Sequence, residues 1–182
     1  MNSTKKEKKK LIIYIAVAYG ITYLMGLLMW YGSSKGYDVT TFPLAQMMYP
    51  ATGVMLALLI TNKGEKKLPI GFFMSIILAT IMTLVMAIFS VIKPCEPIEF
   101  NGTYTDVYNL ISQYIMIIGS IIALIFLAVA GKEKRKNAGL SWNSWGKTIF
   151  VVVVFIAIYF VRTIVSTIVS GVIDGVGLQY MN

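Results

Sequence analysis

Five long apolar segments dominate this chain, at residues 11–31, 42–61, 70–92, 107–130 and 149–173. Each has about 20 residues or more, and a helix of that length spans the ~30 Å hydrocarbon core of a bilayer. Of the 182 residues, 57% are hydrophobic and 13% are charged, and the mean hydropathy is +0.74. Because lipid offers the backbone no hydrogen-bond partners, such segments fold as helices. The sequence therefore predicts an all-α, polytopic membrane helix bundle of about five helices, with residues 1–182 as a single domain.

Lysine-rich segments alternate with these apolar runs. Thirteen of the sixteen basic residues lie within residues 5–10, 63–67 and 132–147. Basic loops stay on the cytoplasmic side of a membrane, so we expect the N-terminus inside and the C-terminus outside. The net charge of +8 then reflects topology, and we expect the lipid bilayer, not nucleic acid, as the partner. Fourteen Lys against two Arg, with much Ile, favour a bacterial source, which predicts a multi-pass protein of the bacterial plasma membrane.

The second apolar run, Phe42–Ile60, differs from a simple membrane anchor, because it contains a proline and a polar side chain. Pro50 removes a backbone donor inside the predicted helix and frees the carbonyl of Gln46 one turn earlier. Gln46 also places an amide among apolar residues. Unsatisfied polar groups cost several kcal/mol in lipid. We therefore expect this helix inside the bundle, with Gly53 and Ala57 letting a neighbouring helix come close.

Small and hydroxyl side chains also predict how the first and third helices behave. Along the first helix, small residues interrupt the large ones and predict close helix contact: Ala16, Gly20 and Gly26. The third helix carries hydroxyls that are expected to bond back to their own backbone: Ser75, Thr80, Thr83 and Ser90.

The connections between the later helices carry turn and cap signals. Asn101-Gly102 predicts a tight two-residue turn in the outer loop 93–106, with short arms that favour a turn over a stable sheet. Asp106 is suited to cap the helix that follows. The segment 141–147, SWNSWGK, has two Trp three residues apart and predicts a short stretch at the level of the lipid headgroups.

The fifth run carries one charge, Arg162, about 20 Å along the helix from Ile149. Seventeen Ile, Val or Phe residues contribute about 5–10 kcal/mol to insertion, against about 3 for a central Arg, so the segment still inserts. None of the five runs contains a carboxylate. Arg162 therefore bonds to carbonyls, hydroxyls or Gln46, reaches water through a defect, or meets an acidic group from another chain. Gln46 and Arg162 are the candidate intramembrane polar site, for which a structural and a functional role both stay open.

The sequence contains no constellation for catalysis. It has no His and one Cys, Cys95, which excludes a His-based triad and an internal disulfide. The eight acidic residues lie in termini, loops or helix caps, and they form no convincing zinc site. A glycine-rich phosphate loop of the required spacing is also missing. We therefore expect no catalytic residue, no metal site and no cofactor.

Three stretches carry a resemblance to a known family. They are LIIYIAVAYGITYLMGLLMW after the Lys-rich start, FPLAQMMYPATGVMLALLI, and the basic turn GKEKRKNAGL. Together they resemble the amino-terminal half of the CPBP family of intramembrane endopeptidases, the CAAX protease and bacteriocin-processing group. The family's motifs, Glu-Glu-x-x-x-Arg, Phe-x-x-x-His and His-x-x-x-Asn or Asp, do not occur, so no catalytic residue carries over. The resemblance implies a truncated or non-catalytic relative, inactive in peptide hydrolysis by itself.

Two other interpretations remain open. The chain is alternatively a non-enzymatic membrane scaffold or a binding subunit, for example of the bacteriocin-immunity type, in which a partner helix supplies a carboxylate to Arg162. A small transporter component is the third interpretation, and it needs more polar residues along a path than Gln46 and Arg162. The partners implied are other membrane helices or further copies of this chain.

Overall fold

The chain folds almost entirely into α-helices. The computed structural model describes residues 3–62, 64, 67–100, 102–140 and 145–173. It divides into two compact units, residues 1–141 and 142–182, which are described separately. Within the described residues, four helical segments are long and apolar enough to cross a membrane: Thr4–Ser34, Thr41–Asn62, Ile70–Ile92 and Val107–Val129. These segments correspond to the first four predicted spans and make the chain a helical membrane protein.

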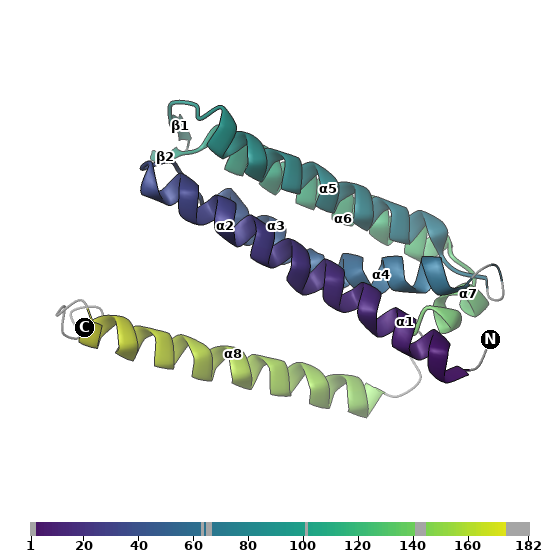
Figure 1. Ribbon diagram of the computed structural model, residues 1–182. Helices are drawn as coiled ribbons and strands as arrows, with labels where there is room; N and C mark the ends of the chain where they lie inside the picture. The colour runs from purple at the N-terminus through teal and green to yellow at the C-terminus, as the bar shows by residue number, and fades with distance from the viewer. Residues whose placement is uncertain (1–2, 63, 65–66, 101, 141–144, 174–182) are drawn as a thin grey trace. The chain divides into compact units, whose positions relative to one another are not determined.

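The first span is one long rod with an irregular turn at its centre. It consists of α1 (Ser3–Ile15), the π-helical segment η1 (Ala16–Gly20) and α2 (Ile21–Ser34). Figure 1 shows these three segments running end to end. Helix α1 begins before the apolar run, so the lysine-rich start of the chain is helical as well.

The first rod packs through a different face from the expected one. A Cβ atom built on Gly20 or Gly26 would meet nothing within 4 Å, so the expected close contact at these glycines is wrong. Ala16 is exposed too, whereas Ala18 and Met25 are buried. The first rod therefore packs through the side that carries these two buried residues.

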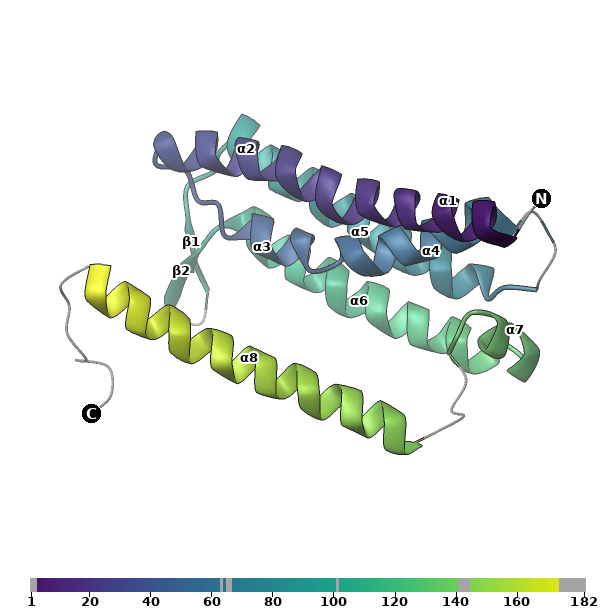
Figure 2. The same cartoon turned by 60° about the horizontal axis from the view of Figure 1, so that its bottom comes forward.

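The second span is broken, not continuous. Helix α3 (Thr41–Gln46) ends in a turn at Met47 and Met48, and α4 (Tyr49–Asn62) follows (Figure 2). The Met48 amide donates to the Ala45 carbonyl at 3.1 Å, a tighter turn than an α-helix makes. Pro50 therefore lies in the first turn of α4 and not inside a continuous helix. A missing backbone donor is tolerated at that position.

The second span lies inside the bundle, as predicted. Phe42, Ala45 and Tyr49 are fully buried and pack with residues of α2 and the third span. Gly53 lies close to the first rod, because a Cβ there would lie 3.3 Å from the Tyr14 carbonyl oxygen. Ala57, one turn later, is buried as well. The prediction that a neighbouring helix comes close at Gly53 and Ala57 is confirmed.

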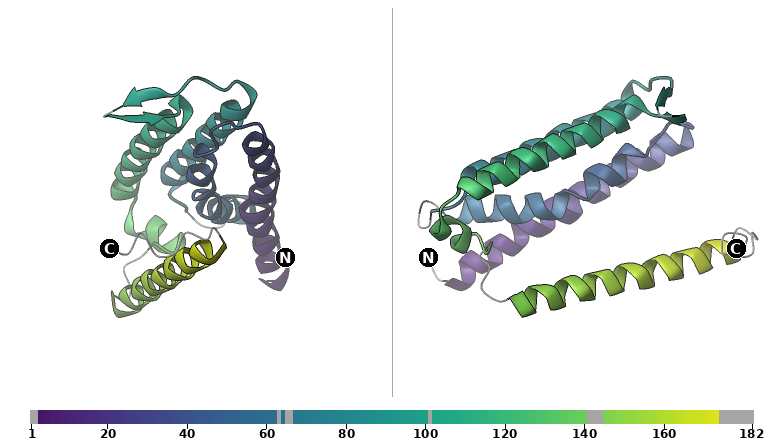
Figure 3. Two further views of the ribbon diagram at one scale, coloured as in Figure 1. Left: turned by 90° about the vertical axis from the view of Figure 1, so that its left-hand side faces the viewer. Right: turned by 180° about the vertical axis from the view of Figure 1, so that it is seen from behind.

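The third and fourth spans form a helical hairpin. Helix α5 (Ile70–Ile92) leads into strands β1 (Ile98–Phe100) and β2 (Thr103–Thr105), and α6 (Val107–Val129) returns alongside α5. Figure 3 shows the two helices side by side from two directions. A short helix, α7 (Lys132–Asn137), follows α6.

Close packing between α5 and α6 depends on glycines. A Cβ on Gly119 would lie 2.8 Å from the Cβ of Ala79, and one on Gly71 would lie 2.6 Å from a ring carbon of Phe126. The hydroxyls of α5 bond back to carbonyls three or four residues earlier, as predicted: Ser75, Thr80, Thr83 and Ser90.

The outer loop forms a small antiparallel sheet around the predicted turn. Phe100 pairs with Thr103 and Ile98 with Thr105, so the chain reverses between Phe100 and Thr103, where Gly102 lies. Gly102 has φ +77°, a left-handed conformation that glycine adopts without steric cost. The predicted reversal of the chain is confirmed. Its three-residue arms pair as two strands, whereas their short length favours a turn without a sheet.

The second unit contains helix α8 (Trp145–Ile173), 29 residues long. It covers the fifth predicted span and carries Arg162. Its described side chains include a shorter apolar stretch, Val153–Val165, and the fifth crossing stays a prediction. Of the predicted headgroup segment 141–147, residues 141–144 lie outside the described part, and Trp145–Lys147 begin α8.

Candidate functional site

Most of the described basic residues of the first unit gather at one end of its helices, and Lys35 and Lys93 lie at the other. The start of α1, the connection between α4 and α5, and helix α7 all lie there, opposite the end that carries the β1–β2 hairpin (Figures 1 and 3). We call this region the lysine-rich end, with its described basic residues Lys5, Lys6, Lys8, Lys9, Lys10, Lys67, Lys132, Lys134, Arg135 and Lys136. Basic residues from each of the three predicted segments, as far as these belong to the described part of the first unit, therefore lie at the same end of its helices. The orientation in the membrane stays a prediction.

A hollow of about 190 Å³ opens at the lysine-rich end. We call it the basic hollow. Its wall comes from α1, the last turn of α4, the α4–α5 connection and the end of α7, with the lining residues Lys6, Glu7, Lys10, Leu58, Thr61, Asn62, Leu68 and Asn137. The lining thus has two lysines, one glutamate, three uncharged polar side chains and two leucines.

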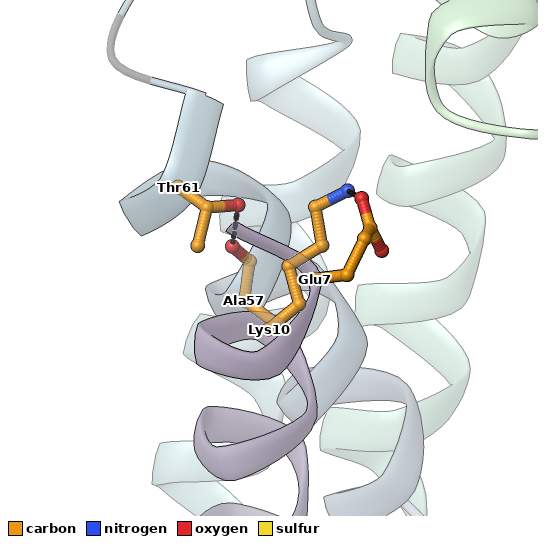
Figure 4. Close-up of polar contacts among 4 residues, drawn as sticks. All are labelled: Glu7, Lys10, Ala57 and Thr61. Carbon is orange, nitrogen blue, oxygen red and sulfur yellow. Dashed lines mark hydrogen bonds and ion pairs between the residues drawn. The ribbon is translucent and has the colours of Figure 1, made fainter. Parts of the chain in front are cut away.

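Local hydrogen bonds hold the polar groups of the basic hollow. The Lys10 ammonium donates to the Glu7 carboxylate at 2.7 Å within α1, and the Thr61 hydroxyl donates to the Ala57 carbonyl at 2.6 Å within α4 (Figure 4). Lys10 retains two further N–H donors. Because the Thr61 hydroxyl donates its hydrogen to the Ala57 carbonyl, it can only accept any further hydrogen bond.

Helix α7 is tied to the α4–α5 connection beside the basic hollow. The side-chain amide of Asn137 donates to the Lys67 carbonyl at 3.1 Å. The Lys67 ammonium lies 3.7 Å from the Glu133 carboxylate, an exposed pair that adds little stability. A second hollow adjoins the first, since both are lined by Asn62 and Leu68, and it adds Leu59, Gly64, Lys67, Ile70 and Lys134.

Most buried polar groups between the helices of the first unit have partners. The hydroxyls of Thr52 in α4 and Thr80 in α5 share a 2.7 Å hydrogen bond. Near the opposite end, Asp106 accepts from the Asn109 amide at 3.2 Å, which confirms the predicted cap of α6. Asp106 also accepts from the Thr41 hydroxyl at 3.3 Å. These bonds join α4 to α5 and α3 to the start of α6, so they serve the packing of the bundle.

Two buried hydroxyls have no hydrogen-bond partner in the described part of the chain. They belong to Tyr49, at the start of α4, and Ser112, in α6. Both side chains are fully buried. An unpaired buried hydroxyl costs stability, because it loses its bonds to water without replacing them.

The predicted intramembrane site is divided between the two units. Gln46 is the last residue of α3, half-buried beside the helix break. Arg162 lies in α8 of the second unit. The suggested bond between these two side chains therefore stays a prediction.

The described residues contain no group of three or more His, Cys, Asp or Glu side chains able to hold a metal ion. Glu96 and Glu99 are exposed near the hairpin. Cys95 is exposed as well, with its sulfur 3.4 Å from the Tyr108 hydroxyl. The geometry of these side chains offers no nucleophile and base placed for catalysis.

Sequence reasoning missed the basic hollow as a site, because it treated the lysines as topology signals alone. One signal was present: Lys6 and Lys10 are four residues apart and lie on one face of a helix. The other walls come from residues more than 40 positions away, which no local pattern links to α1.

Comparison of the chain with known proteins finds no matching family model, no matching curated protein and no matching solved structure. The resemblance to the CPBP family therefore stays a prediction from sequence.

Proposed function

We propose that this chain is a non-catalytic membrane subunit that binds a partner helix through Arg162. The observation that carries the proposal is a guanidinium within α8, a helix of 29 residues that contains no acidic residue. A charge at membrane depth is costly, and such residues pair with a counter-ion or mark a functional position.

The acidic residues of the first unit lie outside its apolar spans. In its described part, the carboxylates lie at helix ends or in connections: Glu7, Asp38, Glu96, Glu99, Asp106 and Glu133. Asp106 is buried, but it already accepts bonds from Thr41 and Asn109 as a helix cap. A carboxylate within an apolar span must therefore come from another chain, either a different membrane protein or a relative of this one.

Affinity capture in a mild detergent tests the proposal. The full chain and two variants, Arg162→Ala and Arg162→Lys, are compared for the membrane proteins that they retain. We expect one partner with an acidic residue inside a span to be lost with Arg162→Ala and partly kept with Arg162→Lys, because Lys keeps the charge but not the two-pronged geometry.

Arg135→Ala is the matched control, since Arg135 is the other arginine of the chain and lies in α7 outside the spans. It should leave the partner unchanged. Exchanging the charges, with Arg162→Glu here and Arg in place of the partner's carboxylate, should restore capture. Unchanged recovery with Arg162→Ala contradicts the proposal.

The resemblance to the CPBP family supports a second proposal. In it, the helices of the first unit are the scaffold of a longer protease and the wall through which its substrate enters. The support is limited to the three sequence stretches, which form the first rod, the broken second span and the turn at α7. An open reading frame beyond Asn182 that encodes Glu-Glu-x-x-x-Arg would support it, and the absence of one would contradict it.

A further inference from the structure

We propose that the basic hollow binds the headgroup of one anionic phospholipid. The inference does not depend on Arg162, because every residue of the hollow belongs to the first unit. The ligand class follows from the charge, the hydrogen-bond donors and the apolar wall of the site.

The charge of the site favours an anion. Four lysines line the basic hollow and its neighbour, namely Lys6, Lys10, Lys67 and Lys134. Against them stand Glu7, in the lining, and Glu133, which pairs with Lys67. Four positive charges less two negative ones leave +2, enough to attract a phosphodiester that carries one negative charge.

The donors of the site suit phosphate oxygens. Lys10 donates one ammonium hydrogen to the Glu7 carboxylate, and the Asn137 amide donates one of its two hydrogens to the Lys67 carbonyl. Both side chains line the hollow and keep further hydrogens for a ligand. Charge-assisted bonds from ammonium to phosphate are among the stronger hydrogen bonds in proteins.

The apolar part of the wall selects a lipid over a soluble phosphate. Leucines line both hollows, and Ile70, which is 60% exposed, continues the wall onto the surface of α5. The last turn of α4 and the first turn of α5 form this wall, where two membrane-spanning segments end. A ligand with an anionic head and acyl chains covers both parts, whereas a free phosphate leaves the apolar part exposed to water.

Native mass spectrometry of the purified full chain tests the proposal. The chain is released from detergent in the presence of equimolar phosphatidylglycerol and phosphatidylcholine, and the ratio of the two bound lipids is measured. We expect the chain to retain phosphatidylglycerol preferentially, with one tightly held molecule. Equal retention of the two lipids overturns the proposal.

Paired variants separate the hollow from general surface charge. Lys6→Gln/Lys10→Gln removes two lysines that line the hollow, and Lys8→Gln/Lys9→Gln removes two exposed lysines of the same helix that do not. A lysine beside an anionic surface strengthens binding by about fivefold. We expect the first pair to lower the preference for phosphatidylglycerol by at least about fivefold, and the second to change it less than twofold. An equal loss in both pairs overturns the proposal, because it indicates non-specific attraction.

A second comparison on α7 guards against misfolding of the α1 variants. Lys134→Gln alters the lining of the adjoining hollow, whereas Lys132→Gln alters the same helix outside both hollows. Only Lys134→Gln should weaken the preference. Glycerol phosphate, added as a competitor, identifies the source of the anion: failure to displace the lipid supports the proposal, and full displacement at lipid-like concentration overturns it in favour of a soluble phosphate.

Discussion

The contact between α5 and α6 at Gly119 allows a sharp test of the packing. A methyl group at position 119 would lie 2.8 Å from the Cβ of Ala79. The optimal separation of two carbon atoms is about 3.5–4.0 Å. Ala79 is buried, and its side chain has no rotamer by which to move away. Gly119→Ala must therefore separate the two helices by roughly 1 Å or distort them.

We expect Gly119→Ala to be less stable than a matched variant, Gly26→Ala, in which the new methyl group meets nothing within 4 Å. Both substitutions gain up to about 1 kcal/mol of helix propensity. Only the first overpacks an interface, which costs about 1–3 kcal/mol. The free energies of unfolding of the two variants should therefore differ by about 1–3 kcal/mol.

The assay is unfolding in mixed micelles with increasing SDS, followed by far-UV circular dichroism. The double variant Ala79→Gly/Gly119→Ala moves the methyl group from α5 to α6 and keeps the composition of the interface. It should return to within about 0.5 kcal/mol of the original chain, since overpacking is relieved and the propensity terms cancel. If Gly119→Ala matches Gly26→Ala in stability, or if Ala79→Gly brings no relief, the reasoning about this contact is wrong.

Four further predictions concern residues of the first unit. In the same SDS titration, Tyr49→Phe should raise the free energy of unfolding by about 1 kcal/mol, because the substitution removes an unpaired buried hydroxyl. Thr52→Val should lower the free energy of unfolding by about 0.6 kcal/mol, because this substitution removes a hydrogen bond between α4 and α5. A change of opposite sign in either variant contradicts this account. Asp106→Ala should cost about 1–2 kcal/mol through loss of the α6 cap, whereas Asp106→Asn should cost less, because Asn also caps helices; equal costs would show that the cap is not the relevant interaction. Cys95, exposed near the hairpin, should react with a membrane-impermeant maleimide in intact cells, whereas Lys134→Cys on a Cys95→Ser background should react only after lysis. The reverse pattern would refute the expected orientation.

Several features were determined by the sequence alone, because their physics is local. The bilayer acts as a uniform solvent, so the length and polarity of a segment are enough to identify a membrane-spanning helix. The chain reversal between Phe100 and Thr103 and the cap at Asp106 depend on residues within a few positions of each other. The hydroxyls of α5 likewise find their acceptors one turn away in the same helix.

Only the tertiary structure decided which face of each helix meets a neighbour. Small residues at positions 20 and 26 predict a contact, yet Ala18 is the buried one, within a π-helical turn. A helix turns about 100° per residue, and a π-helical turn takes more residues than an α-helical one, so the facing side cannot be read by counting from the sequence. The position of the break before Pro50 has a similar origin, since the proline is equally compatible with a kink and with a new helix start.

The basic hollow depends on tertiary structure for the same reason. Its lysines are visible in the sequence as charge, but the site exists because α1, the end of α4 and α7 converge at one end of the first unit. Charge patterning determines on which side of a membrane a loop stays, since that depends on the number of Lys and Arg residues near the ends of each span. A binding site requires particular side chains from distant segments to lie within a few ångströms of each other, and only the packing of the helices brings them there.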